Sequence, residues 1–125
     1  MDEFSDRVTT IEELKEMTES FCKSLDWNKF NNPRNVASSL SVEANELLEI
    51  FLWRDEKELD SFFDDPVKRE KIEHELADVM FAVLTFSYMY NIDLSETFRK
   101  KMEHNRKKYP ADKFKGSARK YNEDK

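Results

Sequence analysis

Hydrophobic residues recur at helical spacing along most of the chain, beginning with the segment after Thr10. Its apolar positions are Ile11, Leu14, Met17, Phe21 and Leu25. They fall every three or four residues and therefore share one face of a helix. Thr10 and Glu13 form the S/T-x-x-E pattern of a capping box. The pattern predicts a helix that begins at residue 11 and ends near the polar segment 26–33.

A second helix is expected over residues 33–53. Asn32 suits its N-cap, and Pro33 suits its first turn because proline has no backbone N–H to leave unpaired there. The following segment, residues 54–65, is polar and predicts a short helical or irregular connector.

Two more helices follow the connector. The third, over residues 66–90, is apolar nearly all round after Val79, which is typical of a central helix buried on several sides. Asp93 and Glu96 form another capping box, which begins a fourth helix over residues 94–108.

These elements predict an all-α fold, a subunit of the four-helix bundle type, and no strand. The chain has one glycine and three prolines, too few for the turns of a sheet protein. We expect an extension over residues 1–9, one domain over 10–110, and an irregular tail over 111–125.

The formal charge of −6 and the sequence pI of about 5.1 argue against general attraction to nucleic acid or to anionic membranes. The single cysteine, Cys22, predicts a small core residue in a reducing compartment. We find no N-terminal signal pattern and no apolar run of roughly 20 residues, the length that crosses a membrane. The expectation is a cytoplasmic protein.

Acidic residues interrupt the apolar face of two of these helices. The apolar residues within about 60° of Glu43 on its helix are Val36, Leu40, Leu47 and Ile50. Those near Glu75 on the third helix are Ile72, Val79, Ala82 and Phe86. Glu46 and Asp78 follow three residues after each of these acids, at the edge of the same face.

Four carboxylates on packing faces need an explanation, because an unpaired buried carboxylate costs several kcal/mol and like charges repel. Protonation, pairing with buried Arg or Lys, or a bound cation would each relieve the cost. The simplest alternative is that helix ends or edges leave these residues exposed. If a cation is held, an oxygen-only ligand set without histidine favours Mg²⁺, with Mn²⁺ as a substitute, over zinc or a di-iron centre.

A set of motifs in this order resembles the MazG-like all-α nucleoside triphosphate pyrophosphohydrolases, and most closely their dCTP pyrophosphatase branch. The motifs are "DWNKFNNPRNVASSLSVEANELLEIFLW", "HELADV" and "KMEHNRKKYP", followed by "GSARKY" in the tail. The resemblance covers roughly residues 10 to 121, and the order of the acid pairs and the K-x-x-x-N-x-x-x-Y-P segment is more specific than any motif alone.

The resemblance implies a Mg²⁺-dependent enzyme that cleaves a nucleoside triphosphate between the α- and β-phosphates. It implies that the metal ligands are Glu43, Glu46, Glu75 and Asp78. Either Glu46 or Glu49 is a candidate to take the proton from the attacking water. The family also implies a homo-oligomer, with a tetramer favoured and a dimer as the alternative.

Further residues are candidates for binding the nucleotide. Trp27 and Trp53 match positions that line the nucleotide pocket in the family, and aromatic faces stack on bases. Arg34 and Asn35 belong to the same shared pattern. On the fourth helix Lys101, Asn105 and Lys108 share one face, with Tyr109 nearby, and this face would suit a polyphosphate.

The chain departs from these relatives at two positions that shape the base pocket. Thr18 stands where they carry histidine, and Ala82 stands where they can carry an aromatic residue. The preference for dCTP over related or modified deoxynucleotides is therefore left open.

Two functions are compatible with the sequence. One is a pyrophosphohydrolase that removes unwanted nucleotides from the pool. The other is a non-catalytic helical module that binds a nucleotide or a partner and keeps the acids as a structural cation site. Phenylalanines such as Phe62, Phe63 and Phe81 predict apolar surface that a monomer would leave uncovered, which favours an oligomer.

Overall fold

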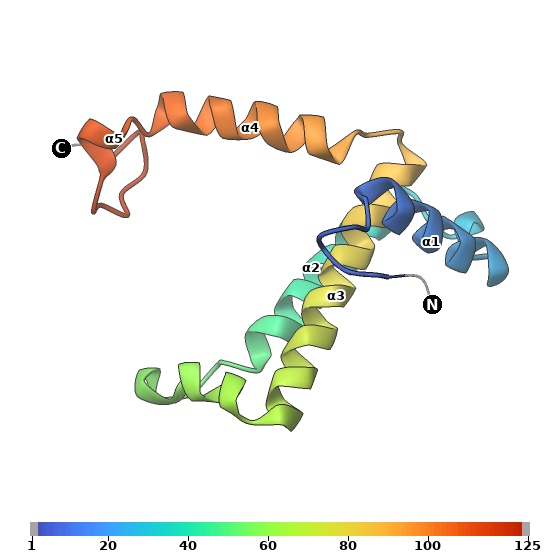
Figure 1. Ribbon diagram of the computed structural model, residues 1–125, viewed down its shortest axis with the longest axis horizontal. Helices are drawn as coiled ribbons and strands as arrows, with labels where there is room; N and C mark the ends of the chain where they lie inside the picture. The colour runs from blue at the N-terminus through green and yellow to red at the C-terminus, as the bar shows by residue number, and fades with distance from the viewer. Residues whose placement is uncertain (1–2, 124–125) are drawn as a thin grey trace. The chain divides into compact units, whose positions relative to one another are not determined.

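The computed structural model describes residues 3–123, and all regular structure within that range is helical (Figure 1). The longer helices are α1 (Ile11–Ser24), α2 (Pro33–Glu49), α3 (Pro66–Met89) and α4 (Leu94–Lys108). The short ones are η1 (Trp27–Lys29), η2 (Glu56–Glu58), η3 (Asp60–Asp64) and α5 (Ala111–Phe114). The predicted all-α class is confirmed.

The chain divides after Asn91 into two compact units. Helices α1, α2 and α3 belong to the first unit, and α4 and α5 belong to the second. The division falls inside the domain predicted for residues 10–110, and the limits of that domain remain a prediction.

The predicted helix starts are confirmed by their caps. Thr10 Oγ1 accepts a hydrogen bond from the backbone N–H of Glu13 at 3.1 Å, and Asn32 Oδ1 accepts one from Asn35 at 2.8 Å. Asp93 Oδ1 accepts one from Glu96 at 2.9 Å. Each of these side chains pairs a backbone N–H that the first helical turn leaves without a partner.

One predicted boundary, the end of the second helix, is wrong. Helix α2 ends at Glu49 rather than at Trp53, because its last turn tightens into bonds such as Phe51 N–H to Leu48 O at 2.9 Å. Trp53 then adopts a positive φ of 60°, which turns the chain toward η2. In the tail, residues 111–114 form the short helix α5, whose Phe114 packs edge-on against the Tyr109 ring at 4.9 Å.

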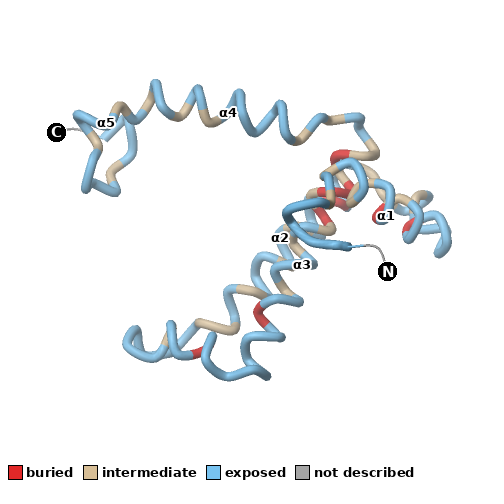
Figure 2. The backbone as a smooth tube through the Cα atoms, viewed as in Figure 1, coloured by how far each residue is buried: buried red, intermediate tan, exposed pale blue. Residues whose placement is uncertain are grey.

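Helix α3 is the central element of the first unit, as its all-round apolar sequence predicts. It packs along α2 in antiparallel orientation and also contacts α1 (Figure 1). Buried positions gather where these three helices meet (Figure 2). They include Thr18, Cys22, Val36, Ala82, Leu84, Thr85 and Ser87, whereas Ile72 is buried nearer the start of α3. Although α3 is largely apolar, no helix in residues 3–123 is long and apolar enough to cross a membrane.

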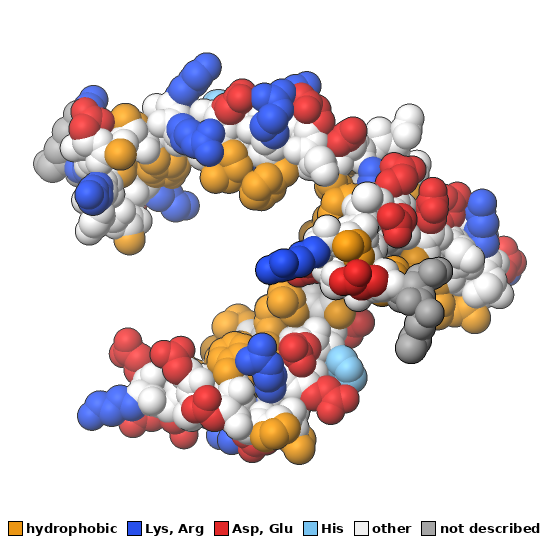
Figure 3. Space-filling view, viewed as in Figure 1, with side chains coloured by type: hydrophobic (Ala, Val, Ile, Leu, Met, Phe, Trp, Pro, Cys, Tyr) orange, Lys and Arg blue, Asp and Glu red, His pale blue; other side chains and the backbone are white. Residues whose placement is uncertain are grey.

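Large apolar side chains also reach the surface of the first unit (Figure 3). Trp53 is 97% exposed, Val67 77% and Leu76 57%. Phe63 is exposed as expected, but Phe62 is buried, with its ring stacked on Phe51 at 5.9 Å. The expectation that Phe62 contributes to an uncovered surface is therefore wrong.

Candidate functional site

The antiparallel packing of α2 against α3 brings acidic residues of the two helices together. Glu43, Glu75 and Asp78 each offer a carboxylate oxygen, and these oxygens lie within 4.8 Å of one another. Glu43 and Glu75 are half-buried, whereas Asp78 is exposed. We call these three residues the acid cluster.

Two oxygens near this point are buried and have no hydrogen-bond partner in the described structure, Glu43 Oε2 and Glu75 Oε2. Burial is the main cause that raises the pKa of the Glu43 carboxyl above its ordinary value, followed by the side chain of Glu46. The charges of Asp78 and Glu75 raise it further.

The pKa of Glu75 is raised in the same way. Burial is again the largest cause, and the side chain of Glu46 and the charge of Asp78 add to it. Lys71 lowers this pKa, but its effect is the smaller one. The folded environment of Glu43 and Glu75 therefore disfavours the ionised form of each carboxyl group relative to water.

The structure excludes one of the three remedies for this repulsion. No Arg, Lys or His within residues 3–123 forms a salt bridge with Glu43, Glu75 or Asp78. Protonation and a bound cation remain. Three converging carboxylates, two of them with an unpartnered buried oxygen, are hard oxygen donors and fit Mg²⁺ or Mn²⁺ in their ligand chemistry.

Two cavities adjoin the acid cluster, and both lie within the first unit. The larger, of about 540 Å³, is lined by Glu75 together with Glu46 and Glu49 of α2. Its remaining lining residues are Ile50, Arg54, Phe62, Lys68 and Lys71. The smaller, of about 210 Å³, is lined by Glu43, Asp78, Trp27 and Ala82. Its other lining residues are Cys22, Asn31, Val36, Ser39, Phe81 and Thr85.

Trp27 reaches the smaller cavity from η1, and it is 41% exposed. Its ring meets Phe21 edge-on at 5.5 Å, and Phe21 meets Phe81 of α3 at 5.9 Å. The hydroxyl of Tyr88 on α3 donates to Asn28 Oδ1 at 2.6 Å, which ties η1 to the core helix. An aromatic surface is thus held beside the two acids that line this cavity.

The sequence and the overall structure both match known proteins. Residues 38–123, more than half of the chain, match the MazG-like family. The chain belongs to the MazG-like family.

Named relatives of this MazG-like chain include dCTP pyrophosphatase 1 of Mus musculus, 32% identical over 112 residues, which are 90% of this chain and 66% of the relative. The Homo sapiens dCTP pyrophosphatase 1 is 32% identical over 114 residues, 91% of this chain and 67% of the relative. The chain thus spans about two thirds of the length of these relatives. A solved pyrophosphatase structure from Archaeoglobus fulgidus DSM 4304 has a TM-score of 0.74 and 33% identity, over 88% of this chain and 98% of that one.

Three predicted nucleotide-binding residues of the MazG-like chain line neither cavity. Trp53 lies beyond the end of α2 with its side chain almost fully exposed. Arg34 is exposed in the first turn of α2, and Asn35 donates from Nδ2 to the backbone oxygen of Phe30 at 2.9 Å. The hydrogen bond of Asn35 holds the loop between η1 and α2, and substrate roles for all three remain predictions.

The predicted phosphate-binding residues of α4 belong to the second unit. Lys108 lies with its Nζ 4.3 Å from the centre of the Tyr121 ring, and Tyr109 packs against Tyr121 at 6.0 Å. Asn105 is half-buried, and Lys101 is exposed. The tail thus folds back onto the end of α4, and the roles of these residues remain predictions.

The basic lining of the larger cavity was not predicted from the sequence, and it consists of Arg54, Lys68 and Lys71. A signal was present, because Lys68, Lys71 and Glu75 are spaced i, i+3 and i+7 and therefore share one face of α3. The small polar residues of the other cavity, Ser39 and Thr85, carried no such signal.

Proposed function

We propose that this protein hydrolyses a nucleoside triphosphate, with dCTP or a related or modified deoxynucleotide favoured, to the monophosphate and pyrophosphate. Its task would be to keep the nucleotide pool clean, in the cytoplasm. The names of two of its relatives and of the solved structure support a pyrophosphatase. One observation of the molecule itself carries the proposal: three acids converge beside two cavities, and two of them, Glu43 and Glu75, each have a buried oxygen without a hydrogen-bond partner.

The reaction consumes one water molecule for each anhydride bond broken. The oxygen of water ends on one of the two phosphate products, and the two protons are released or held according to pH. Glu43, Glu75 and Asp78, with Glu46 beside them, would hold Mg²⁺, or Mn²⁺ in its place. Such an ion supplies polarisation of phosphoryl oxygens and a lower pKa for water.

Two residues are in place to accept the proton of the attacking water. Glu46 and Glu49 are both exposed on α2 and both line the larger cavity, one helical turn apart. The side chain of Glu46 interacts with both Glu43 and Glu75, so Glu46 lies next to the acid cluster. Comparing Glu46→Gln with Glu49→Gln separates the roles: loss of Mg²⁺ binding identifies a ligand, and loss of turnover with intact Mg²⁺ binding identifies the base.

The nucleoside would occupy the smaller cavity, where Trp27 offers an aromatic face to the base. Ala82 is buried in the wall of this cavity, and its methyl group leaves room that a larger side chain would fill. This room fits a base with an added substituent. Trp53, Arg34 and Asn35 remain proposed contributors to the same site.

The second unit would contribute to phosphate binding through Lys101, Asn105, Lys108 and Tyr109. We also propose a homo-oligomer, a tetramer in preference to a dimer, because the exposed apolar side chains of α2, α3 and their connector need cover. Light scattering on the purified protein measures the assembly directly.

The deciding experiment is pyrophosphate release from a panel of dNTPs and NTPs, with Mg²⁺, with Mn²⁺ and with EDTA. We expect metal-dependent release that is fastest with dCTP or a modified cytidine triphosphate. Triphosphate binding without release by folded protein, across natural and modified nucleotides, would support the non-catalytic binding module instead.

A further inference from the structure

The larger cavity has a basic side that the acid cluster does not explain. Arg54, Lys68 and Lys71 line it together with Glu46 and Glu49. Along α3, Lys71 and Lys68 precede Glu75 by four and seven residues, which is roughly 6 and 10 Å of helix. The shared face of α3 therefore changes from acidic to basic as it passes from the acid cluster into the cavity. We call the three residues the cationic wall.

A buried aromatic ring supports two of these cations. Lys68 Nζ lies 4.6 Å from the centre of the Phe62 ring, and Arg54 Cζ lies 5.7 Å from it. Phe62 is only 4% exposed, so the ring provides a fixed platform. Contacts of this kind hold a cation by attraction to the face of the ring while leaving its N–H groups free to donate.

The cations of the wall have no salt-bridge partner among the described residues, although the charge of Lys71 is near enough to Glu75 to lower the pKa of that carboxyl. Their neighbour Arg69, which lies outside the cavity on α3, does have such a partner in Glu73, with Nε 3.6 Å from Oε2. Unpaired cations thus coincide with the cavity.

We propose that the cationic wall binds the distal phosphates of the triphosphate substrate. The nucleoside then lies in the smaller cavity, the bond to be broken lies over the acid cluster, and the leaving pyrophosphate lies in the larger cavity. Lysine supplies point charges and arginine a planar fork, and both are standard partners of phosphate oxygens. This inference rests on the proposed function, since it assigns the two ends of that substrate to two different cavities.

The assignment has a consequence for selectivity. A nucleoside monophosphate ends at the acid cluster and does not reach the cationic wall, whereas pyrophosphate alone does. The wall therefore contributes to the affinity for triphosphate and for pyrophosphate, and it contributes nothing to the affinity for monophosphate.

The test uses calorimetric binding of three probes in the presence of Mg²⁺: inorganic pyrophosphate, an α,β-imido analogue of dCTP, and dCMP. The variants are Lys68→Gln, Lys71→Gln, the double variant and Arg54→Gln. Lys57→Gln is the matched control, because Lys57 is exposed in η2 and lines neither cavity. Circular dichroism and Mg²⁺ titration of each variant verify folding and the metal site.

We expect pyrophosphate and the analogue to bind roughly tenfold more weakly for each cation removed, about a hundredfold in the double variant. Affinity for dCMP should stay within about twofold, and Lys57→Gln should match the wild type. If the double variant does not fold, the single variants and Arg54→Gln carry the test.

Three results would overturn the cationic wall as a phosphate site: no pyrophosphate binding by the wild type, unchanged binding by the variants, or an equal loss for dCMP and the analogue. Turnover of the wild type decides the proposed function separately. If the wild type is active and the variants bind pyrophosphate as tightly as the wild type, the cationic wall is rejected as a phosphate site and the proposed function stands. If the wild type is inactive and the double variant loses affinity for pyrophosphate, the proposed function is rejected and the cationic wall stands as a phosphate site.

Discussion

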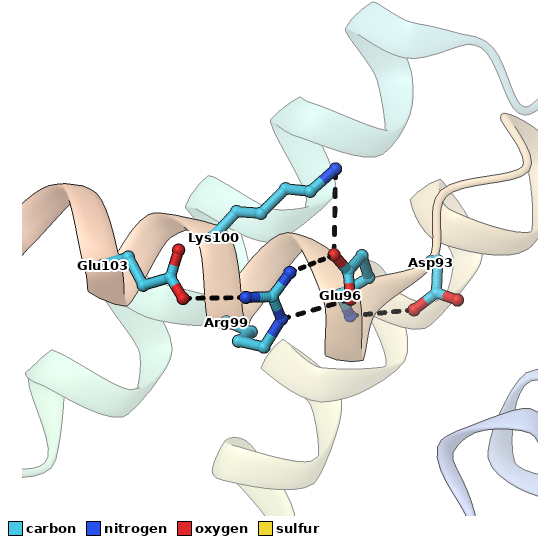
Figure 4. A network of polar contacts seen from close by, with 5 residues as sticks. All are labelled: Asp93, Glu96, Arg99, Lys100 and Glu103. Carbon is cyan, nitrogen blue, oxygen red and sulfur yellow. Dashed lines mark hydrogen bonds and ion pairs between the residues drawn. The ribbon is translucent and has the colours of Figure 1, made fainter.

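Two groups of charged side chains in this protein are built in opposite ways. The acid cluster joins like charges from α2 and α3, and two of the nearby oxygens are buried without a partner. On α4, Arg99 instead pairs with Glu96 and Glu103 of its own helix, with Arg99 Nη1 2.8 Å from Glu103 Oε1 (Figure 4). Lys100 and Asp93 complete this second group, which we call the α4 network.

The pKa shifts of the two groups have opposite signs. Burial and neighbouring acids raise the pKa of Glu43 and Glu75, whereas the hydrogen bond from Arg99 lowers the pKa of Glu96. In the α4 network the charged groups of Glu96, Arg99, Lys100 and Glu103 are exposed, and each has an oppositely charged partner about one helical turn away. Asp93 accepts a hydrogen bond from the backbone N–H of Glu96. In the acid cluster the protein holds charges that it does not compensate, and a ligand from outside can supply the missing charge. The difference distinguishes the α4 network, a surface feature, from the acid cluster, a candidate metal site.

Removing a ligand from the acid cluster is expected to have the largest effect. Glu43→Gln and Asp78→Asn should lower the rate of pyrophosphate release by at least about 100-fold, because changes to residues that merely support a metal ligand already cost 10–100-fold. The measurement is kcat for dCTP at saturating Mg²⁺. Glu103→Gln of the α4 network is the matched control and should keep its rate. Normal turnover in Glu43→Gln would show that the acid cluster is not the metal site.

Adding Mg²⁺ should stabilise the protein through the acid cluster alone. At a free concentration of 100 times Kd, a ligand that binds only the folded state adds about 2.7 kcal/mol to the free energy of unfolding. Denaturant titration with Mg²⁺ and with EDTA should show this gain in the wild type and in Glu96→Gln. The gain should vanish in the double variant Glu43→Gln/Glu75→Gln, and an equal gain in all three proteins would argue for a cation site elsewhere.

The metal-free protein should lose stability as the pH rises from about 4.5, the ordinary pKa of these carboxyls. The folded state keeps the protons of Glu43 and Glu75 to a higher pH than the unfolded state does. It therefore binds more protons in this window, and the free energy of unfolding falls until the raised pKa values are passed. Denaturation in EDTA between pH 4 and pH 8 measures the fall.

Glu43→Gln/Glu75→Gln should flatten this dependence. The α4 network acts in the opposite direction, since the lowered pKa of Glu96 gives stability that is lost as the pH falls through that pKa. If the free energy of unfolding of the double variant falls by as much as that of the wild type over this pH range, other groups cause the pH dependence.

Breaking the α4 network should have the smallest effect. Arg99→Gln removes partners of two exposed carboxylates, and exposed ion pairs contribute little because water and salt screen them. We expect unchanged turnover and a shift of the thermal midpoint smaller than that of either acid-cluster variant in EDTA. A large loss of activity in Arg99→Gln would assign this network a role at the site.

Some residues of the candidate site could be predicted from the sequence, and others could not. Glu43 and Glu75 could be singled out because each interrupts an apolar face, and the face of a helix follows from spacing alone. The missed Lys68 and Lys71 share a face with Glu75, but they lie on a stretch of α3 in which most residues are charged. Only their position beside Glu46 and Glu49 of another helix distinguishes them from ordinary surface lysines. Trp53 was expected on α2, but the tightened last turn of that helix placed it beyond the helix end.

The sequence by itself determined the helices, their starts and the acid pairs. Caps at Thr10, Asn32 and Asp93 act within three residues, and an i, i+3 pair of acids needs only one helical turn, so both are local properties of the chain. The tertiary structure decided which acids meet, because the register of α2 against α3 sets Glu43 beside Asp78 and Glu75 beside Glu46. The same register formed the two cavities and left the cationic wall without a salt bridge to any residue in the range 3–123. Distances between helices depend on the packing of the whole unit, which no short segment encodes.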